Sequence, residues 1–408
     1  QTQINLAFLT VNLGVCQTMM RKKYKVSLIL FVFGVAILLT ACATLNRPQF
    51  GHLPEQARLE RIKQSPHYVH DEFAYPIATP MLRDGESTLK IFWDNFWAEE
   101  QQTVPTQALP TVKTNLLALN PHQDVVIWLG HSAYYIQLAG KRILIDPVLS
   151  DHAAPFSFLV KAFKGTTFYQ AKDIPEIDYL LISHDHYDHL DYETVTQLKD
   201  KVTNVVVPLG RGWLLEYCSD PLSNIDVYDW CTTLRTDTGL NIHTLPARHY
   251  SGRTFTRNKT LWASYALETP THKIYFGGDS GYGPHFQQIA SQLGGFDLVM
   301  LDSGQYDPRW PLIHMNPEEA VQAAMDLKAK AMMPMHVGRF SLSPHAWDEP
   351  FKRAVKASET ADLTLATPKI GQPIWLNEPI TEFPHWWESL SLTGLFPVNL
   401  NQKMSQIL

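Results

Sequence analysis

The sequence predicts an α+β fold in which stacked β-sheets are covered by helices, and three observations support this. Apolar runs of four to seven residues follow one another between residues 125 and 301, with the length and composition typical of β-strands. A helix is predicted from Asn316, because this N-cap residue precedes Pro317 at the first helical position and two glutamates in the first turn. Of the 408 residues 45% are hydrophobic, so the chain can bury a large core, and wholesale disorder is excluded.

The elements are predicted in the following order. An irregular extension at residues 42–120, rich in proline and aromatic residues, contains one short helix near residues 87–101. Residues 133–138 and 141–146 alternate around an Ala-Gly turn as a hairpin. The other strands are predicted at Val125–Gly130, Asp178–Ser183, Asn204–Pro208, Asn241–Leu245, Trp262–Glu268, Lys273–Phe276 and Leu298–Leu301. The apolar stripe of the helix after Asn316 consists of Ala320, Val321, Ala324 and Leu327.

Composition excludes several classes of protein. The 21 glycines and 27 prolines are scattered, which excludes a collagen-like chain. No repeat of about 20–50 residues supports a solenoid or a propeller. With 40 acidic and 34 basic side chains, and no basic block beyond the N-terminal region, the chain is not expected to bind nucleic acid. Because aromatic side chains dominate core burial, we expect core positions rather than membrane contact for Trp93, Trp97, Trp386 and Trp387.

Residues 1–41 are predicted to be upstream residues and a signal peptide. Four basic residues at positions 21–25 lead into an apolar run at 26–39, which is shorter than the roughly 20 residues that a membrane span needs. The sequence LTAC at 39–42 resembles a bacterial lipobox, whose cysteine becomes the lipidated first residue of the mature chain. We therefore expect a lipid anchor at Cys42 in the bacterial cell envelope, and Ala43 favours the outer membrane, facing the periplasm. The alternative is an uncleaved N-terminal anchor.

The sequence has four cysteines, of which Cys16 lies in the predicted signal region and Cys42 in the lipobox. The other two are Cys218 and Cys231. The cell envelope permits disulfides, so a bridge between these two residues is one expectation, and two buried free thiols are the other. Their separation is not the spacing of a zinc knuckle, and we assign neither of them a catalytic role.

The strongest chemical signal directly follows the strand predicted at 178–183. Three imidazoles and two carboxylates occur within six residues, His184-Asp185-His186-Tyr187-Asp188-His189. So much polarity cannot be buried without partners, and imidazole together with carboxylate suits zinc and related divalent ions. In an extended segment His184 and His186 lie on one side, while Asp188 and His189 on the following turn can face a second ion. One ion can use only three or four of these groups, so a pair of metals is the simplest interpretation.

Three further candidate ligands lie at the ends of other predicted strands. His249 follows the strand at 241–245, and His336 follows a short apolar run at 333–335. Asp279 lies in the turn GGDSG, where little side-chain bulk obstructs the approach to a metal. Each residue alone would be a weak signal, because a single His or Asp usually serves the structure. Together with the six-residue cluster they predict one shared metal site.

This pattern resembles that of a known family. HDHYDH with the later His249, Asp279 and His336 is similar to the HxHxDH pattern of the metallo-β-lactamase superfamily, a four-layer αββα sandwich with two metals at the sheet edges. More narrowly, the chain resembles the N-acyl-phosphatidylethanolamine-hydrolysing phospholipases D and their bacterial relatives. The segments that carry this resemblance are WLGHS (128–132), LIDPVLSDHAAP (144–155), PARHYSGR (246–253), GGDSGY (277–282), HMNPEEAV (314–321) and MHVGRF (335–340). The resemblance runs from about Val125 to Phe340, and we expect a hydrolase domain at 121–380, followed by a C-terminal tail at 381–408.

The resemblance implies a role for each of these residues. The ligands of the first metal would be His184, His186 and His249. The ligands of the second metal would be Asp188, His189 and His336. Asp279 would bridge the two metals. Asp146 would orient the ligand histidines from behind, and His131, in the WLGHS segment, would lie near the metals without binding them.

The implied activity is that of a binuclear zinc hydrolase, with two Zn²⁺ per chain and a bridging hydroxide that attacks phosphorus. The leaving alcohol would receive its proton from His314 or from the non-ligand Asp185, and the sequence leaves both open. The substrate would be a phospholipid, and the products phosphatidic acid and an N-acylethanolamine. A lactonase or another carbonyl hydrolase on the same di-metal site is the alternative, and a non-catalytic envelope protein that keeps the fold is a third. The cluster reads HDH rather than HxE, which argues against the di-iron oxygen-reducing branch.

Overall fold

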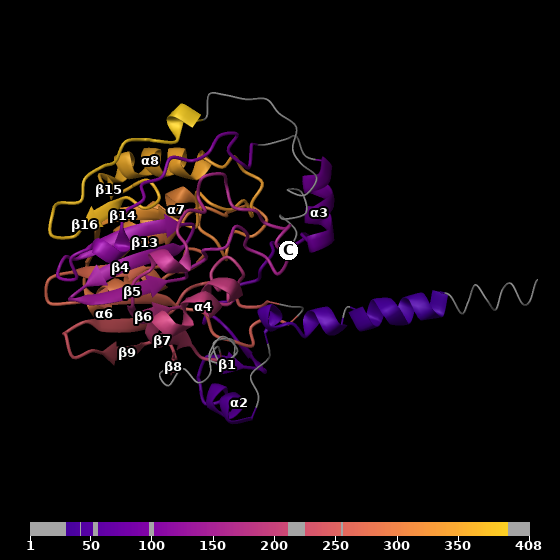
Figure 1. The fold of residues 1–408 in the computed structure, drawn as a ribbon. Coiled ribbons are helices and arrows are strands. Elements are labelled where there is room, and N and C mark those ends of the chain that lie inside the picture. Colours follow the sequence, from indigo (N-terminus) through magenta and orange to yellow (C-terminus); the bar gives the residue numbers. More distant parts are fainter. Residues whose placement is uncertain are drawn as a thin grey trace, which may run out of the picture. The chain divides into compact units, whose positions relative to one another are not determined.

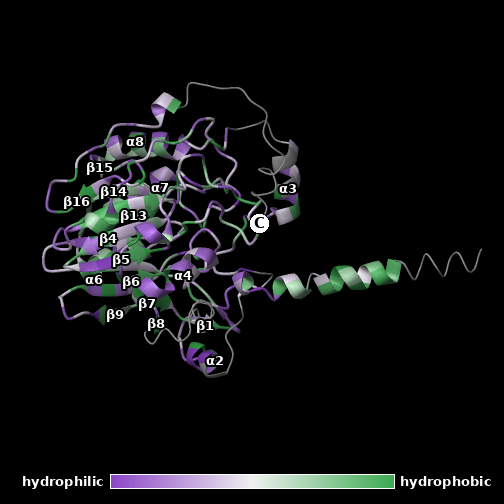
Figure 2. Ribbon diagram, viewed as in Figure 1, coloured by the Kyte–Doolittle hydropathy of each residue, from purple (hydrophilic) through white to green (hydrophobic). Residues whose placement is uncertain are grey.

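The structure, a computed structural model, describes residues 30–40, 42–51, 56–97, 102–210, 225–253 and 256–390. The chain forms two compact units, residues 1–51 and residues 52–408. In the first unit, residues 30–40 and 42–45 are helical and Pro48–Phe50 (η1) form a 3-10 turn. Figure 2 shows that the run 30–40 is almost wholly hydrophobic. None of the helices in the described ranges is both long enough and apolar enough to cross a membrane. Most of the predicted signal peptide, residues 1–29 and 41, lies outside the described residues.

The second unit is built around two seven-stranded sheets (Figure 1). In spatial order, the first sheet consists of β16 (Pro373–Trp375), β3 (Val125–Gly130), β4 (Ala133–Leu138), β5 (Lys141–Ile145), β6 (Ile177–Leu181), β7 (Val202–Pro208) and β8 (Ile225–Tyr228). The second sheet consists of β15 (Thr364–Leu365), β14 (Ala329–Met335), β13 (Phe296–Asp302), β12 (Lys273–Phe276), β11 (Ser264–Glu268), β10 (Asn241–Leu245) and β9 (Thr232–Arg235). A small separate sheet pairs β1 (Tyr68–Val69) with β2 (Glu72–Phe73) in the extension.

Helices lie on the outer faces of the two large sheets and in the extension. The α-helices are α2 (Gln56–Ile62), α3 (Thr88–Trp97), α4 (Tyr192–Leu198), α6 (His285–Leu293), α7 (Pro317–Asp326) and α8 (Glu349–Ala361). Short 3-10 helices are η2 (Leu116–Ala118), η3 (Ala171–Asp173), η4 (Lys199–Lys201) and η5 (Glu388–Leu390). The predicted start of α7 is confirmed: the Asn316 side chain accepts a hydrogen bond from the Glu319 backbone N–H, and the Glu319 carboxylate accepts one from the Asn316 backbone N–H.

Three apolar clusters establish the order of the layers. One cluster fills the space between the two sheets, with Trp128 from β3 and Tyr265 from β11 among its members. A second cluster joins the opposite face of the first sheet to α4. A third joins the opposite face of the second sheet to α6, α7 and α8. The order is therefore helix, sheet, sheet, helices, and the predicted four-layer αββα sandwich is confirmed.

The predicted strands are all present, and one difference in their bounds shapes the site. β6 ends at Leu181, two residues before the predicted end at Ser183. Ser183 leaves the strand ladder because its N–H donates to the Asp146 carboxylate at 2.7 Å. Its carbonyl accepts from the N–H of Ala263, which directly precedes β11 of the second sheet, at 3.0 Å. The end of β6 therefore ties the two sheets together directly before the His-Asp cluster.

The prediction for the tryptophans is half wrong. Trp386 and Trp387 are buried, but Trp93 and Trp97 on α3 are 51% and 74% exposed. Leu89, Trp93 and Trp97 recur every four residues and so share one side of the helix, which α3 turns away from the core. The two indole rings stack on each other with their centroids 6.5 Å apart. Aromatic content alone did not indicate which side of this helix faces outward.

The cysteine expectations are tested only in part. Cys42 and Cys231 are exposed, so Cys231 does not fit the alternative of two buried thiols. Cys218 lies outside the described residues, and the bridge between it and Cys231 stays a prediction.

Candidate metal centre

Strand direction brings the predicted ligands to one edge of the sandwich. In the first sheet β5, β6, β7 and β8 run parallel, and in the second sheet β12, β13, β14 and β15 do so. β10 runs in the same direction as β12, because both pair antiparallel with β11. Parallel strands end at the same edge of a sheet, where ligands of α/β proteins usually bind. The site residues that follow these strands are Asp146 (β5), His184 (β6), His249 (β10), Asp279 (β12) and His336 (β14).

Four side chains, here called the first ligand group, have the spacing of one metal shell. His184, His186, His249 and Asp279 each bring a ligand atom within 4.8 Å of the others. His186 Nδ1 lies 2.9 Å from His184 Nε2 and 3.3 Å from His249 Nε2. Asp279 Oδ2 lies 3.5 Å from His184 Nε2 and 3.7 Å from His249 Nε2. Ligands at about 2.1 Å from a tetrahedral zinc ion lie roughly 3.4 Å apart, so these distances suit one ion.

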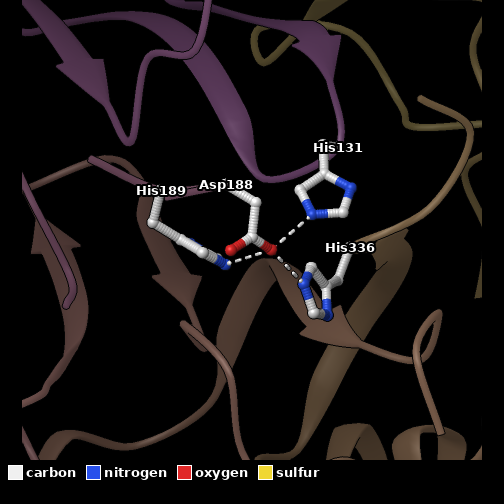
Figure 3. A group of neighbouring side chains, drawn as sticks. All are labelled: His131, Asp188, His189 and His336. Carbon is white, nitrogen blue, oxygen red and sulfur yellow. Dashed lines mark hydrogen bonds and ion pairs between the residues drawn. The ribbon is translucent and has the colours of Figure 1, made fainter. Parts of the chain in front are cut away.

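A second ligand group consists of His131, Asp188, His189 and His336, all of them buried. Figure 3 shows the three imidazole rings around the Asp188 carboxylate. Asp188 Oδ2 lies 2.8 Å from His131 Nε2, 2.9 Å from His336 Nε2 and 3.4 Å from His189 Nε2. Asp279 adjoins this group as well, with Oδ1 3.1 Å from His189 Nε2 and Oδ2 3.4 Å from His336 Nε2. Asp279 therefore lies between the two groups.

Partners behind the ligands fix which ring nitrogen faces the site. His249 Nδ1 donates to the Ile313 carbonyl at 2.9 Å, and His189 Nδ1 donates to Asp146 Oδ2 at 2.8 Å. A carbonyl or carboxylate oxygen can only accept, so Nδ1 carries a proton, and in the neutral ring the Nε2 lone pair points into the site. Ser183 Oγ gives its proton to Asp146, so it accepts from His184 Nδ1 and orients that ring in the same way. The rings are thus held ready to bind a cation.

Two buried atoms at the centre indicate that a cation belongs there. Within the described ranges, His189 Nε2 and Asp279 Oδ1 have no hydrogen-bond partner, although they lie only 3.1 Å apart. Buried polar atoms are almost always paired. A divalent ion that both atoms bind would satisfy them together, and imidazole with carboxylate is the donor set that zinc prefers. The residues present therefore fit the metal that the sequence predicts.

Burial acts on most of the histidines by disfavouring their charged form. It lowers the pKa of His184 and His249 well below the usual value, and that of His131 and His186 to about 4. These four rings are neutral at physiological pH. Neutral imidazole is the form that binds metal.

Carboxylates reverse this effect at the two remaining ligand histidines. Burial lowers the pKa of His189, but the Asp279 and Asp188 charges outweigh it and hold that pKa well above 6.5. At His336, Asp279 and Asp302 likewise outweigh burial and raise the pKa to about 10. Without metal, protons on these two rings balance the buried carboxylates. Metal binding would release those protons.

Asp302, at the end of β13, was missed by the sequence analysis. Its Oδ2 accepts from His314 Nδ1 at 2.7 Å and from the Ser280 N–H at 3.2 Å, and its Oδ1 accepts from His336 Nδ1 at 3.2 Å. It is fully buried. The signal in the sequence was a single Asp directly after the predicted strand at 298–301, which is too common to stand out.

Of the two candidate proton donors, the geometry favours His314. Asp185 accepts from the Gly252 N–H at 2.7 Å and from Thr260 Oγ1 at 2.8 Å, so its carboxylate holds a loop. It belongs to neither ligand group. His314 is held by Asp302 through Nδ1 and lies with Asp279 and His336 in a set whose ligand atoms are within 4.8 Å. His314 therefore lies close to residues of both ligand groups, as a proton donor at this site must.

Asp146 and His131 take different places around the metal ligands. Asp146 lies behind His189 and Ser183, and it is fully buried. His131 was expected near the metals without binding them, but its Nε2 is one of the atoms of the second ligand group. Its carbonyl accepts from the His336 N–H at 3.3 Å, and this contact joins the loops after β3 and β14. His131, Asp146 and His336 have positive φ angles of 55°, 42° and 64°, a strain that clusters at functional sites.

The glycine before Asp279 is required by the backbone. Gly278 has a φ of 58°, and a Cβ at this position would lie 2.7 Å from the Ala263 carbonyl oxygen. Easy approach to the metal was the expected reason for this glycine. The structure gives a different reason. A side chain at position 278 would collide with the backbone of Ala263, directly before β11, so glycine is needed for the turn that places Asp279 between the ligand groups.

Comparison with known proteins shows what this chain is similar to. A family model described as the beta-lactamase superfamily domain matches residues 141–337, a range that contains all seven predicted metal ligands. An uncharacterized protein of Mycobacterium tuberculosis is 38% identical over 330 residues, which are 80% of this chain and 88% of that protein. The outer membrane protein RomA of Klebsiella pneumoniae is 56% identical over 100 residues, 24% of this chain and 76% of that protein. The N-acyl-phosphatidylethanolamine-hydrolyzing phospholipase D 1 of Caenorhabditis elegans is 30% identical over 227 residues, 53% of this chain and 64% of that protein.

Proposed function

Because this chain belongs to the metallo-β-lactamase superfamily and has the fold of a metal-dependent hydrolase, we propose that it is a binuclear zinc phosphodiesterase that cleaves a phospholipid. The proposed substrate class is N-acyl-phosphatidylethanolamine, and the proposed cofactors are two Zn²⁺ ions. The observation that carries the proposal is the pair of ligand groups with Asp279 between them.

Charge balance supports two ions rather than one. The site buries four carboxylates, those of Asp146, Asp188, Asp279 and Asp302. Buried charges are stable only when they are paired or bind a metal. Two divalent ions would carry four positive charges, equal to the four carboxylates. They would also neutralise the buried carboxylates, as protons on His189 and His336 do in the metal-free protein.

Bound zinc would lower the pKa of a water molecule, so that hydroxide, the nucleophile, is available at neutral pH. The chain itself supplies orientation and a proton. Asp302 holds the proton of His314 on Nδ1, which leaves Nε2 available for a substrate, and the ring lies close to Asp279 and His336. A protonated Nε2 can donate to the alcohol that leaves the phosphate, the role of a general acid.

The choice of a phosphodiester rests on the relatives and on the His314 segment. The relative from Caenorhabditis elegans is named for hydrolysis of N-acyl-phosphatidylethanolamine. HMNPEEAV, the segment that led to the narrower resemblance, begins with His314, and the structure places this ring beside His249 with their centroids 4.9 Å apart.

We also propose a lipid anchor at Cys42 and a location at the outer membrane, facing the periplasm. The LTAC motif and the exposure of Cys42 support the anchor. A relative that is 56% identical over 100 residues is named as an outer membrane protein, which supports the location. An anchored enzyme would find a phospholipid substrate in the same membrane.

Metal analysis together with a substrate panel tests the proposal. The mature protein should contain about two zinc ions per chain and release phosphatidic acid from N-acyl-phosphatidylethanolamine vesicles. His189→Ala, which removes one ligand, serves as the inactive control. A single bound ion would overturn the binuclear site. Rapid hydrolysis of a lactone panel without any phosphodiester turnover would instead establish a carbonyl hydrolase.

A further inference from the structure

A line of buried hydrogen bonds runs from the N-terminal extension to the metal centre. The Tyr75 hydroxyl, just after β2, lies 2.9 Å from His285 Nδ1 at the start of α6. His285 Nε2 lies 3.3 Å from Ser280 Oγ, and Ser280 directly follows Asp279. The exposed fractions of the Tyr75, His285 and Ser280 residues are 9%, 1% and 0%. We call these three residues the Tyr75 relay.

Ser280 is the point where this relay meets the loops that carry the site. Its Oγ accepts from the Arg248 N–H at 2.9 Å, next to His249. Its own N–H donates to Asp302 Oδ2 at 3.2 Å, and its carbonyl accepts from the Met315 N–H at 3.0 Å, next to His314. A shift of Ser280 would therefore move Asp279, His249 and His314 relative to one another.

The direction of every hydrogen bond in the relay is determined. Ser280 Oγ donates its only proton to the Gly281 carbonyl at 2.8 Å, so its other partners must donate to it. His285 therefore donates through Nε2, and its Nδ1 can only accept, which requires the Tyr75 hydroxyl as donor. Burial, together with the nearby Arg248 charge, lowers the pKa of His285 to about 3, in keeping with a neutral ring. Loss of the Tyr75 hydroxyl would leave a buried acceptor unpaired.

Two further contacts show that the extension is fitted to this place. A Cβ on Gly283 would lie 3.0 Å from His285 Nδ1 and 3.1 Å from the Tyr75 hydroxyl, so any other residue would force these two groups to shift. The extension also holds Arg248, whose Nε donates to Thr79 Oγ1 at 3.0 Å and whose Nη2 donates to the Ala78 carbonyl at 3.2 Å. The extension therefore contacts both the His249 loop and the Asp279 loop.

We propose that Tyr75 is a positioning residue of the metal centre, which acts through His285 and Ser280 to hold Asp279 between the two ligand groups. The extension, which precedes the matched domain at 141–337, is thereby part of the active site. This inference rests on the proposed metal centre but not on the bond that the enzyme cleaves.

The test is the zinc affinity of Tyr75→Phe, measured by competition with a chromophoric chelator. Partners behind metal ligands typically change affinity by about 10- to 100-fold, and we expect a loss near the lower end, roughly tenfold. With Co²⁺ in place of zinc, the visible absorption bands of Tyr75→Phe should shift, because the ligand geometry changes. Tyr68→Phe is the matched control, since Tyr68 lies in β1 of the same extension and its ring packs on Phe73 at 5.0 Å. The control should bind zinc as the wild type does.

A second variant separates positioning from folding. Gly283→Ala pushes Tyr75 and His285 apart without removing either side chain, and it should weaken zinc binding in the same way. If both variants fold and bind zinc with wild-type affinity and wild-type Co²⁺ spectra, the positioning role is wrong. If Tyr68→Phe weakens binding as much as Tyr75→Phe, the effect belongs to the extension as a whole, which also overturns the role. Failure of the wild type itself to bind zinc would refute the proposed function instead.

Discussion

Replacing Asp302 with asparagine should weaken the ion of the second ligand group and spare that of the first. The carboxylate accepts from His336 Nδ1 on one oxygen, and from both His314 Nδ1 and the Ser280 N–H on the other. An amide keeps only one accepting oxygen. The amide can orient its oxygen either towards His314 and Ser280 or towards His336. The first orientation satisfies two donors and the second only one, so we expect the oxygen to face His314 and Ser280 and the NH₂ group to face His336.

The size of the effect follows from this arrangement. His336 Nδ1 would then face an NH₂ donor. If the His336 proton moves to Nε2, that nitrogen cannot bind metal, and if it stays on Nδ1, two N–H donors face each other. Either outcome loses the equivalent of a hydrogen bond to a charged group, about 1.5–3 kcal/mol. Since about 1.4 kcal/mol corresponds to a factor of ten, the affinity for the second ion should fall roughly 10- to 150-fold.

Stepwise removal of zinc by a chelator, followed by elemental analysis, measures both affinities. Asp302→Asn should lose one ion at a chelator concentration at which the wild type keeps two. Asp297→Asn is the control, because Asp297 lies at the opposite end of β13, where it binds Lys330 at 2.7 Å. The reasoning about His336 is refuted if Asp302→Asn keeps both ions with wild-type affinity.

His314→Ala should keep both ions, because the ligand groups are complete without it, and should lower phosphodiester turnover by about 10²–10⁴-fold; wild-type turnover would remove His314 from the mechanism. His189→Ala should lose metal and activity together, and an active variant with two ions by elemental analysis would contradict its place among the ligands. The pKa of His285 is lowered to about 3, so this ring's contribution to stability is complete above pH 6.5 and is lost as the pH falls towards 3. Urea unfolding of the metal-free protein should therefore depend less on pH in His285→Gln, and parallel curves for variant and wild type would speak against this. Cys42→Ser should abolish fatty-acid labelling and signal cleavage, whereas wild-type processing and partitioning would show that the lipobox assignment is wrong.

The sequence predicted the sheets, and the residues that lie together at the site, because both leave local patterns. Strands such as β10 and β12 show their bounds through apolar runs between polar turns, and their ends match the prediction to the residue. The HDHYDH cluster is dense enough to be recognised without knowledge of the fold. Parallel strand order then brings its later partners, such as His336, to the same edge.

What the sequence did not predict depends on contacts between distant segments. Asp302 is one acid after one strand, and it becomes informative only when His314 and His336 both contact it. Tyr75 and His285 are 210 positions apart, and nothing local links them. The four-residue spacing of Leu89, Trp93 and Trp97 places them on one side of a helix. Whether that side faces the core or the solvent is determined by the rest of the fold.

The pairing of β16 with β3 means that one edge of the first sheet is covered only late in the synthesis of the chain. Ile374 pairs with Val126, so the edge of the first sheet is covered by residues that leave the ribosome long after the strand they cover. All six residues of β3 are buried in the finished fold. Until β16 arrives, β3 presents an unpaired and apolar edge, the kind of edge along which partly made chains associate. A nascent chain that stops between α8 and Pro373 should therefore aggregate, although it already contains every residue of the two ligand groups.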